Sequence, residues 1–167
     1  MVLRYLGAFG PATVADARAW SGLGSLREVF ERLRPRLVTF RDERGREHFD
    51  VPGAPLPDPD TPSPPRFLPE FDNAILSHAD RTRIIADEHR ELLIKDRMMR
   101  AILLDGFVRG TWKTERAREK ATLVVEPFEA LSEQDRADLA AEGEWLLRFM
   151  AGSEGAEAFE VRFTRGA

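Results

Sequence analysis

A tract of prolines divides the chain and limits its fold more than any other feature. Eight of the eleven prolines lie between residues 52 and 69, at Pro52, Pro55, Pro57, Pro59, Pro62, Pro64, Pro65 and Pro69. Proline has a fixed φ and no backbone N–H donor, so this density excludes a helix or a central strand. We therefore predict an extended, semi-rigid connector at residues 52–65, between a domain at residues 1–51 and a domain at residues 66–167.

Residues 11–34 are typical of two short helices joined by a tight turn. Thr13-x-x-Asp16 and Ser25-x-x-Glu28 each predict a capping box at the start of a helix. Residues 21–24, Ser-Gly-Leu-Gly, form the glycine-bearing turn between them. In the second helix, apolar residues recur at i, i+3, i+4 and i+7 and predict a buried face: Leu26, Val29, Phe30 and Leu33.

A β-hairpin is predicted to follow these two helices. Residues 36–41 and 46–51 look extended, and residues 42–45, Asp-Glu-Arg-Gly, have turn chemistry. With a helix ending within residues 1–10, the layout predicts a winged helix-turn-helix whose wing is the hairpin. Because that first helix begins without a cap, we expect it to be truncated, with a longer sequence before it.

The second half predicts a mostly antiparallel β unit with one long helix. Strands are expected at residues 101–105 and 107–112 around an Asp-Gly turn, then at 121–128 and 159–163. Ser132 is expected to cap a helix over residues 132–150. Its predicted inner stripe, and two tryptophans predicted to lie in the core, are Leu139, Leu146, Phe149, Met150, Trp112 and Trp145.

Composition excludes several classes of protein. The chain has 167 residues, a net charge of −4 and no cysteine, which removes disulfides, Cys-ligated zinc and thiol nucleophiles. No apolar run reaches the length of a membrane span and no signal-peptide pattern opens the chain, so we expect a cytoplasmic, nucleoid-associated protein without a membrane partner. Residues 1–51 hold nine arginines, no lysine and seven acidic residues, a small local positive excess.

Six short segments together resemble a known bacterial family. They are residues 4–13 (RYLGAFGPAT), 20–23 (WSGL), 68–72 (LPEFD), 77–83 (SHADRTR), 104–106 (LDG) and 110–112 (GTW). The chain resembles the C-terminal half of the winged-helix DNA-binding family of the AlkZ and YcaQ type. Family members stack several winged helices before a β-barrel-like part. The resemblance thus implies an α+β fold, with a winged helix-turn-helix followed by a small antiparallel β-barrel-like unit and a long C-terminal helix.

The resemblance also bears on catalysis. Characterised members of the family are DNA glycosylases that unhook interstrand crosslinks or remove alkylated bases, and they use a Gln-x-Gln motif in the N-terminal half. The only glutamine of this chain is Gln134, alone in the predicted last helix. We therefore predict no catalytic residue, no cofactor and no metal, and no enzymatic activity of this chain on its own.

Arginines of the predicted winged helix are the candidate DNA-binding residues. The second helix would enter the major groove of double-stranded DNA, including damaged duplexes, and the wing would contact its backbone. The candidates are Ser25, Arg27, Arg32, Arg34, Arg36, Arg41, Arg44 and Arg46. The alternative is a solvated surface, since Arg27 with Glu31 and Glu28 with Arg32 are opposite-charge pairs at i,i+4.

Two further functions stay open. One is an interaction or scaffold module that completes a separate N-terminal winged-helix partner chain carrying the catalytic part. The other is a small enzyme using Asp72, His78 and Asp80, although their spacing fits no strong metal motif. We favour a structural role for this region, in which Asp72 caps a helix or pairs with an arginine. The predicted structural motif comprises Leu68, Pro69, Phe71, Asp72, Asp80 and Arg81.

Overall fold

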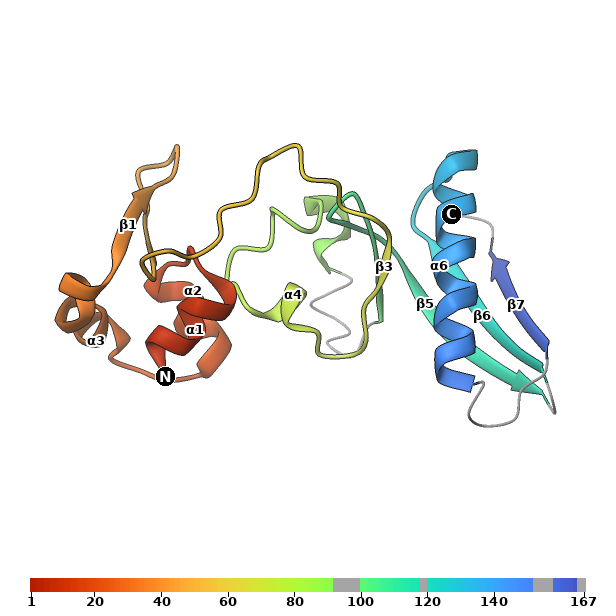
Figure 1. Cartoon of the computed structure of the whole chain (residues 1–167), viewed down its shortest axis with the longest axis horizontal. Helices are drawn as coiled ribbons and strands as arrows, with labels where there is room; N and C mark the ends of the chain where they lie inside the picture. Colours follow the sequence, from red (N-terminus) through yellow and green to blue (C-terminus); the bar gives the residue numbers. More distant parts are fainter. Residues whose placement is uncertain (92–99, 118–119, 152–157, 165–167) are drawn as a thin grey trace. The chain divides into compact units, whose positions relative to one another are not determined.

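Two structural units make up the chain. The computed structural model describes residues 1–91, 100–117, 120–151 and 158–164 (Figure 1). Unit 1 comprises Met1–Thr61 with Asn73–Arg81, and unit 2 comprises Pro62–Asp72 with Thr82–Ala167. The division into domains at residues 1–51 and 66–167 with a connector at 52–65 stays a prediction. The boundaries of the two units differ from it, because residues 73–81 pack in unit 1.

Unit 1 has short helices and one hairpin. Its elements are α1 (Val2–Phe9), α2 (Val14–Ser21), α3 (Leu26–Leu33), the 3-10 turn η1 (Arg34–Arg36), β1 (Val38–Arg41), β2 (Glu47–Asp50) and α4 (Asn73–Leu76). Strands β1 and β2 pair antiparallel, with Val38 opposite Asp50. Buried Tyr5, Leu6 and Phe30 form the core with Phe49 of β2, whose ring meets that of Phe30 edge-on at 5.0 Å. The hairpin therefore covers the helices with its Phe49 side.

The two predicted capping boxes had different outcomes. Thr13 and Asp16 form the predicted box at the start of α2, which is confirmed. The box at Ser25 is wrong, because Ser25 has left-handed backbone (φ 56°) and its side chain makes no capping hydrogen bond. A capping side chain reaches the first turn from extended backbone, which the turn from Gly22 (φ 70°) does not provide here.

Segment Asn73–Arg81 belongs to the core of unit 1 although it follows the proline tract. The Tyr5 hydroxyl donates to the Ser77 carbonyl over 2.7 Å, a buried hydrogen bond. The Trp20 indole N–H donates to the Asn73 side-chain oxygen over 3.1 Å. Both contacts join residues more than fifty positions apart, so local sequence patterns do not predict them.

Unit 2 contains a five-stranded sheet in the order β3-β4-β5-β6-β7. Its elements are β3 (Arg66–Phe67), the 3-10 turn η2 (Asp87–His89), β4 (Ala101–Leu104), β5 (Phe107–Ala117), β6 (Lys120–Pro127), α6 (Glu133–Ala151) and β7 (Ala158–Phe163). The predicted turn at Asp105-Gly106 is confirmed, with φ of 49° and 75°. The chain is thus a mixed α+β protein with a curled half-barrel sheet and a C-terminal helix.

The last strand departs from the antiparallel expectation. β7 pairs parallel to β6, from Lys120 opposite Ala158 to Val125 opposite Phe163. Helix α6 connects these two strands and packs against both of them (Figure 1). A long crossover returns the chain to the end of the sheet where β6 began, and this makes the pair parallel.

Helix α6 faces the sheet with a different stripe from the predicted one. Ser132 caps the helix, as predicted, by accepting from the Asp135 N–H over 3.0 Å. Leu139 is buried, as predicted, and so is Leu147. The predicted core positions of Phe149 and Trp145 are wrong, because these side chains are 72% and 60% exposed. Val161 packs closely against Gly143, because a Cβ added to Gly143 would lie only 3.1 Å from Val161 Cγ2. The helix therefore packs along Leu139, Gly143 and Leu147, and residues two positions further on point about 200° away.

The other predictions for the core of unit 2 divide in the same way. Met150 is 39% exposed and therefore also outside the core, while Leu146 is half-buried and packs against it. Trp112 is buried, as predicted, and its indole N–H donates to the Leu68 carbonyl over 2.9 Å. Among the residues described, no helix is both long enough and apolar enough to span a membrane.

Candidate nucleic-acid interface

The outer surface of α3 carries two exposed arginines. Arg27 and Arg32 both lie on this helix and are exposed. Arg27 borders a groove between α2 and α3, whose lining includes Val14, Arg18 and Ser25. The left-handed Ser25 lies at the start of α3, so the candidates Ser25 and Arg27 share one surface of the two-helix pair.

Arg34, directly after α3, differs from Arg27 and Arg32 because its guanidinium is held by two carboxylates. Its Nε lies 2.9 Å from Glu31 Oε2, and its Nη2 lies 2.9 Å from Glu47 Oε2. It also lies 5.1 Å over the ring of Phe49. Hydrogen bonds from Arg34 lower the pKa of Glu31 and of Glu47, and those two bonds raise the pKa of Arg34. Arg34 therefore ties the end of α3 to the hairpin.

Arg46, between the hairpin turn and β2, is also held by two carboxylates. Its Nε lies 2.6 Å from Asp42 Oδ2 and its Nη1 lies 2.8 Å from Asp80 Oδ2. Hydrogen bonds to Asp80 and then to Asp42 raise the pKa of Arg46. Asp80 comes from segment Asn73–Arg81, so this ion pair fastens that segment to the hairpin within unit 1.

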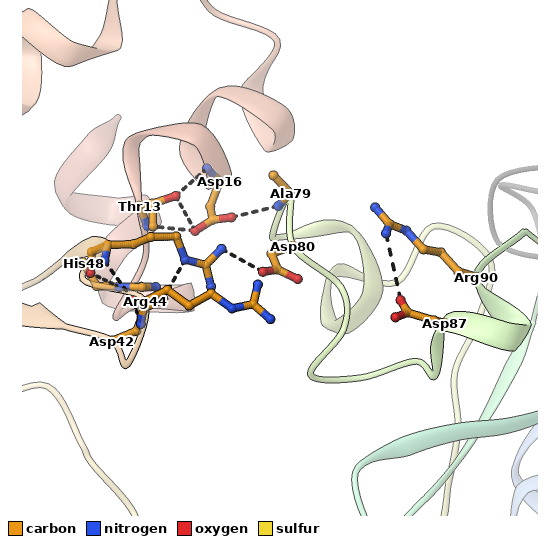
Figure 2. A network of polar contacts seen from close by, with 10 residues as sticks. Thr13, Asp16, Asp42, Arg44, His48, Ala79, Asp80, Asp87 and Arg90 are labelled. Carbon is orange, nitrogen blue, oxygen red and sulfur yellow. Dashed lines mark hydrogen bonds and ion pairs between the residues drawn. The ribbon is translucent and has the colours of Figure 1, made fainter.

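Asp16 joins the start of α2 to the same segment. Figure 2 shows its carboxylate between Thr13 and Ala79. One oxygen accepts from Thr13 N and Oγ1 over 2.8 and 2.7 Å, and the other accepts from Ala79 N over 2.9 Å. Burial alone raises the pKa of Asp16, but the hydrogen bonds from Thr13 and Ala79 and the charge of His78 outweigh it and lower that pKa. The side chain is therefore a charged acceptor that receives three hydrogen bonds within unit 1.

The remaining candidate arginines surround the hairpin. Arg36 ends η1, Arg41 ends β1 and Arg44 lies in the turn, and all three are exposed. Arg41 Nη1 donates to the Gly45 carbonyl over 3.1 Å. Across the described part of the chain, five candidates have no ion pair within 4.0 Å: Arg27, Arg32, Arg36, Arg41 and Arg44.

The predicted charge pairs on α3 give way to others. Glu31 pairs with Arg34 at i,i+3 rather than with Arg27 at i,i+4. Glu47 is the partner that the sequence did not indicate, since it lies thirteen residues from Arg34 and on the hairpin. Only the register of β2 against α3 brings them together, so no signal in the sequence could have found this pair.

The predicted structural motif spans both units. In unit 2, the Glu70 carboxylate pairs with Arg100 at 3.0 Å beside Leu68 and Pro69. Phe71 has left-handed backbone (φ 60°) and is 56% exposed. In unit 1, Asp80 pairs with Arg46 and Arg81 is half-buried. The predicted cap or arginine partner of Asp72 stays a prediction.

The residues of the small-enzyme hypothesis have structural contacts. His78 is buried, with its Nδ1 2.7 Å from Ser77 Oγ. Asp80 is engaged by Arg46, and Asp72 lies in unit 2 rather than in unit 1. Gln134 lies on the exposed side of α6 and donates to Asp138 over 2.9 Å. His78 and Asp80 are thus held by contacts within unit 1, and Gln134 belongs to the outer surface of α6.

A protein family and a solved structure both match this chain. The family model described as DNA glycosylase AlkZ-like matches residues 1–149. The chain belongs to the AlkZ-like DNA glycosylase family. Among solved structures it is similar to the Streptomyces sahachiroi DNA glycosylase AlkZ, with 25% sequence identity and a TM-score of 0.71. That match covers 98% of this chain and 44% of the AlkZ chain.

The match to AlkZ covers only part of that protein. The chain spans less than half the length of the AlkZ structure that it matches. No curated protein matches the chain. The description of the family is that of a DNA glycosylase, a class of DNA repair protein.

Proposed function

We propose that unit 1 is a winged helix-turn-helix that holds duplex DNA for an AlkZ-like glycosylase. In this proposal α3 is the recognition helix, α2 lies across the DNA backbone, and the β1–β2 hairpin is the wing. The observation that carries it is the division of the arginines. Arg34 and Arg46 are bound inside the unit, whereas the other five candidate arginines, on α3, η1 and the hairpin, are exposed and have no ion pair in the described residues.

Chemistry supports this division. A guanidinium presents a planar set of donors that fits phosphate oxygens, and one already bound by two carboxylates has little left to offer a phosphate. Arg27 and Arg32 would therefore contact DNA from the helix, and Arg41 and Arg44 from the wing. Ser25 at the start of α3 would donate to a phosphate from its hydroxyl group.

Catalysis is proposed to need another part of the protein. The family's Gln-x-Gln motif is missing from these residues, and Gln134 is engaged by Asp138. We propose that this chain positions DNA, including damaged duplexes, and that an N-terminal winged-helix part supplies the residues that attack the glycosidic bond.

Fluorescence anisotropy with the full chain and a labelled duplex of about 20 base pairs tests the proposal. Each arginine–phosphate contact releases about one counterion, so Arg27→Ala with Arg32→Ala should reduce the slope of log K against log salt by about 2. We expect the affinity at low salt to fall at least about tenfold, equally for unrelated sequences.

Arg148→Ala is the matched control, since Arg148 is also an exposed helical arginine but pairs with Glu144 on α6. It should leave both affinity and salt slope unchanged. Equal losses in the double variant and in the control, or no binding by the wild type in low salt, would reject DNA binding by α3.

A scaffold module is the second candidate function, and a specific observation favours it. Two of the seven candidate arginines, Arg34 and Arg46, are bound by carboxylates inside unit 1, which leaves fewer guanidinium groups for DNA. In that case the wild type binds no duplex but co-elutes with a separately expressed N-terminal half of an AlkZ-like protein.

A further inference from the structure

Unit 2 brings together one imidazole and two carboxylates that the sequence keeps apart. Glu88 and His89 belong to η2, and Glu129 follows β6 forty residues later. One potential ligand atom of each lies within 4.8 Å of the others. Because the residues come from two separate segments, their convergence is a product of the fold of unit 2.

The separations of these atoms suit a shared metal ion. His89 Nε2 lies 3.4 Å from Glu129 Oε1 and 3.9 Å from Glu88 Oε1. Two ligands of a tetrahedral zinc ion, each bonded at about 2.0–2.1 Å, lie roughly 3.3–3.4 Å apart. A direct charge-assisted hydrogen bond would be shorter, at about 2.7–2.9 Å. The 3.4 Å separation is longer than such a bond and is compatible with two ligands of one ion.

The imidazole is fixed, whereas the carboxylates can adjust. The His89 side chain is only 16% exposed, and its ring lies 4.5 Å from that of Phe128. The Glu88 and Glu129 side chains are 67% and 58% exposed. Exposed carboxylates can change rotamer, so both can turn toward an ion beside His89.

A cavity borders this group of ligands. His89 and Glu129 line a hollow of about 400 Å³ together with Asp105, Arg109 and Asp135. Three protein ligands leave a fourth position of a tetrahedral ion for water or for an added ligand, as in zinc sites that are not purely structural. The carboxylates of Asp105, Glu129 and Asp135 outnumber the one guanidinium in this lining, that of Arg109, so the cavity favours a cation over an anion.

We propose that Glu88, His89 and Glu129 bind one zinc ion, with a fourth coordination position open to this cavity. Imidazole nitrogen with carboxylate oxygen is a donor set that zinc accepts, whereas magnesium prefers an all-oxygen octahedron. The bound ion would fasten η2 to the turn before α6. This proposal is independent of DNA binding by unit 1.

Calorimetric titration of zinc chloride into the chelator-treated full chain tests this site. We expect one zinc per chain and a rise in the melting temperature, because zinc binds the folded state. Magnesium chloride should give neither effect. His89→Ala and Glu129→Gln should each weaken zinc binding at least about tenfold, and cobalt should give the absorption of a four-coordinate ion.

His48→Ala is the control, because His48 is a histidine of strand β2 in unit 1. Its affinity for zinc should equal that of the wild type. The exposed Glu129→Gln change keeps the test valid if His89→Ala loses its fold. Absence of zinc binding up to about 100 µM, or wild-type affinity in Glu129→Gln, would overturn the proposal.

Discussion

At the scale of single residues, Asp16 shows how a buried charge can be compatible with a small core. It is 4% exposed, yet its two oxygens accept three hydrogen bonds, two from Thr13 and one from Ala79. Removal of such an acceptor leaves donors without partners in the interior, which costs more than the bonds themselves contribute. The stability of unit 1 therefore depends on the two carboxylate oxygens of Asp16 as hydrogen-bond acceptors.

Asp16→Asn should lower the free energy of unfolding by about 1–3 kcal/mol at pH 7, because an amide cannot accept all three bonds. The folded-state pKa of Asp16 is lowered, so its stabilisation is complete above its unfolded pKa of about 3.9. It is lost as pH falls through the folded pKa. The gap between wild type and variant should thus narrow below about pH 4.

Thermal unfolding followed by circular dichroism from pH 7 to pH 2 measures this gap. Asp60→Asn is the control, since Asp60 lies exposed in the proline-rich connector. A gap between wild type and Asp16→Asn that stays constant down to pH 2 would contradict the assignment.

At the scale of elements, the end of α1 depends on a close approach to the hairpin. A Cβ on Gly10 would lie 2.3 Å from Asp50 Oδ1 and 2.7 Å from the Leu6 carbonyl oxygen. Asp50 is 1% exposed, so it has no room to move away. Gly7, three residues earlier and inside α1, has no atom within 4 Å of its Cβ position.

Two alanine substitutions should therefore act in opposite directions. Gly10→Ala should destabilise unit 1 by about 1–3 kcal/mol through overpacking against β2. Gly7→Ala should stabilise it by about 0.5–1 kcal/mol, because alanine restricts the unfolded chain and favours the helix. Urea unfolding of both variants checks this contrast, and an equal effect of the two changes would show that α1 does not meet Asp50 as described.

At the scale of the whole molecule, the chain enters unit 1 twice. Met1–Thr61 forms most of the unit, and Asn73–Arg81 completes it through Tyr5–Ser77 and Arg46–Asp80. A cut in the connector would leave both contacts within unit 1. We therefore expect the two pieces to stay together without the covalent link at residues 52–61.

A site-specific protease sequence inserted after Leu56, in the exposed connector, tests this property. After cleavage the two fragments should co-elute in native size-exclusion chromatography, because the Asn73–Arg81 segment stays embedded in unit 1. Tyr5→Phe with Asp80→Ala removes the buried hydrogen bond and the ion pair and should let the fragments separate. Separation of the wild-type fragments would show that the connector alone joins them.

The sequence could predict much of the local structure. The Thr13 box, the helices before the hairpin, the Asp105-Gly106 turn and the Ser132 cap depend on residues a few positions apart. The stripe of α6 could not be predicted, because the close approach of Gly143 to Val161 sets which side faces the sheet. The candidate arginines can be named from the sequence, but the sequence does not show which of them pair with carboxylates inside unit 1.

By itself, then, the sequence determined the helices before the hairpin, the Asp105-Gly106 turn and two of the caps, since capping and turn chemistry act over a few residues. Only the tertiary structure decided that Arg34 meets Glu47 and that Arg46 meets Asp80. It also decided that His89 lies beside Glu129. These contacts join residues that are distant along the chain, and their partners are fixed by the packing of whole elements rather than by any local pattern.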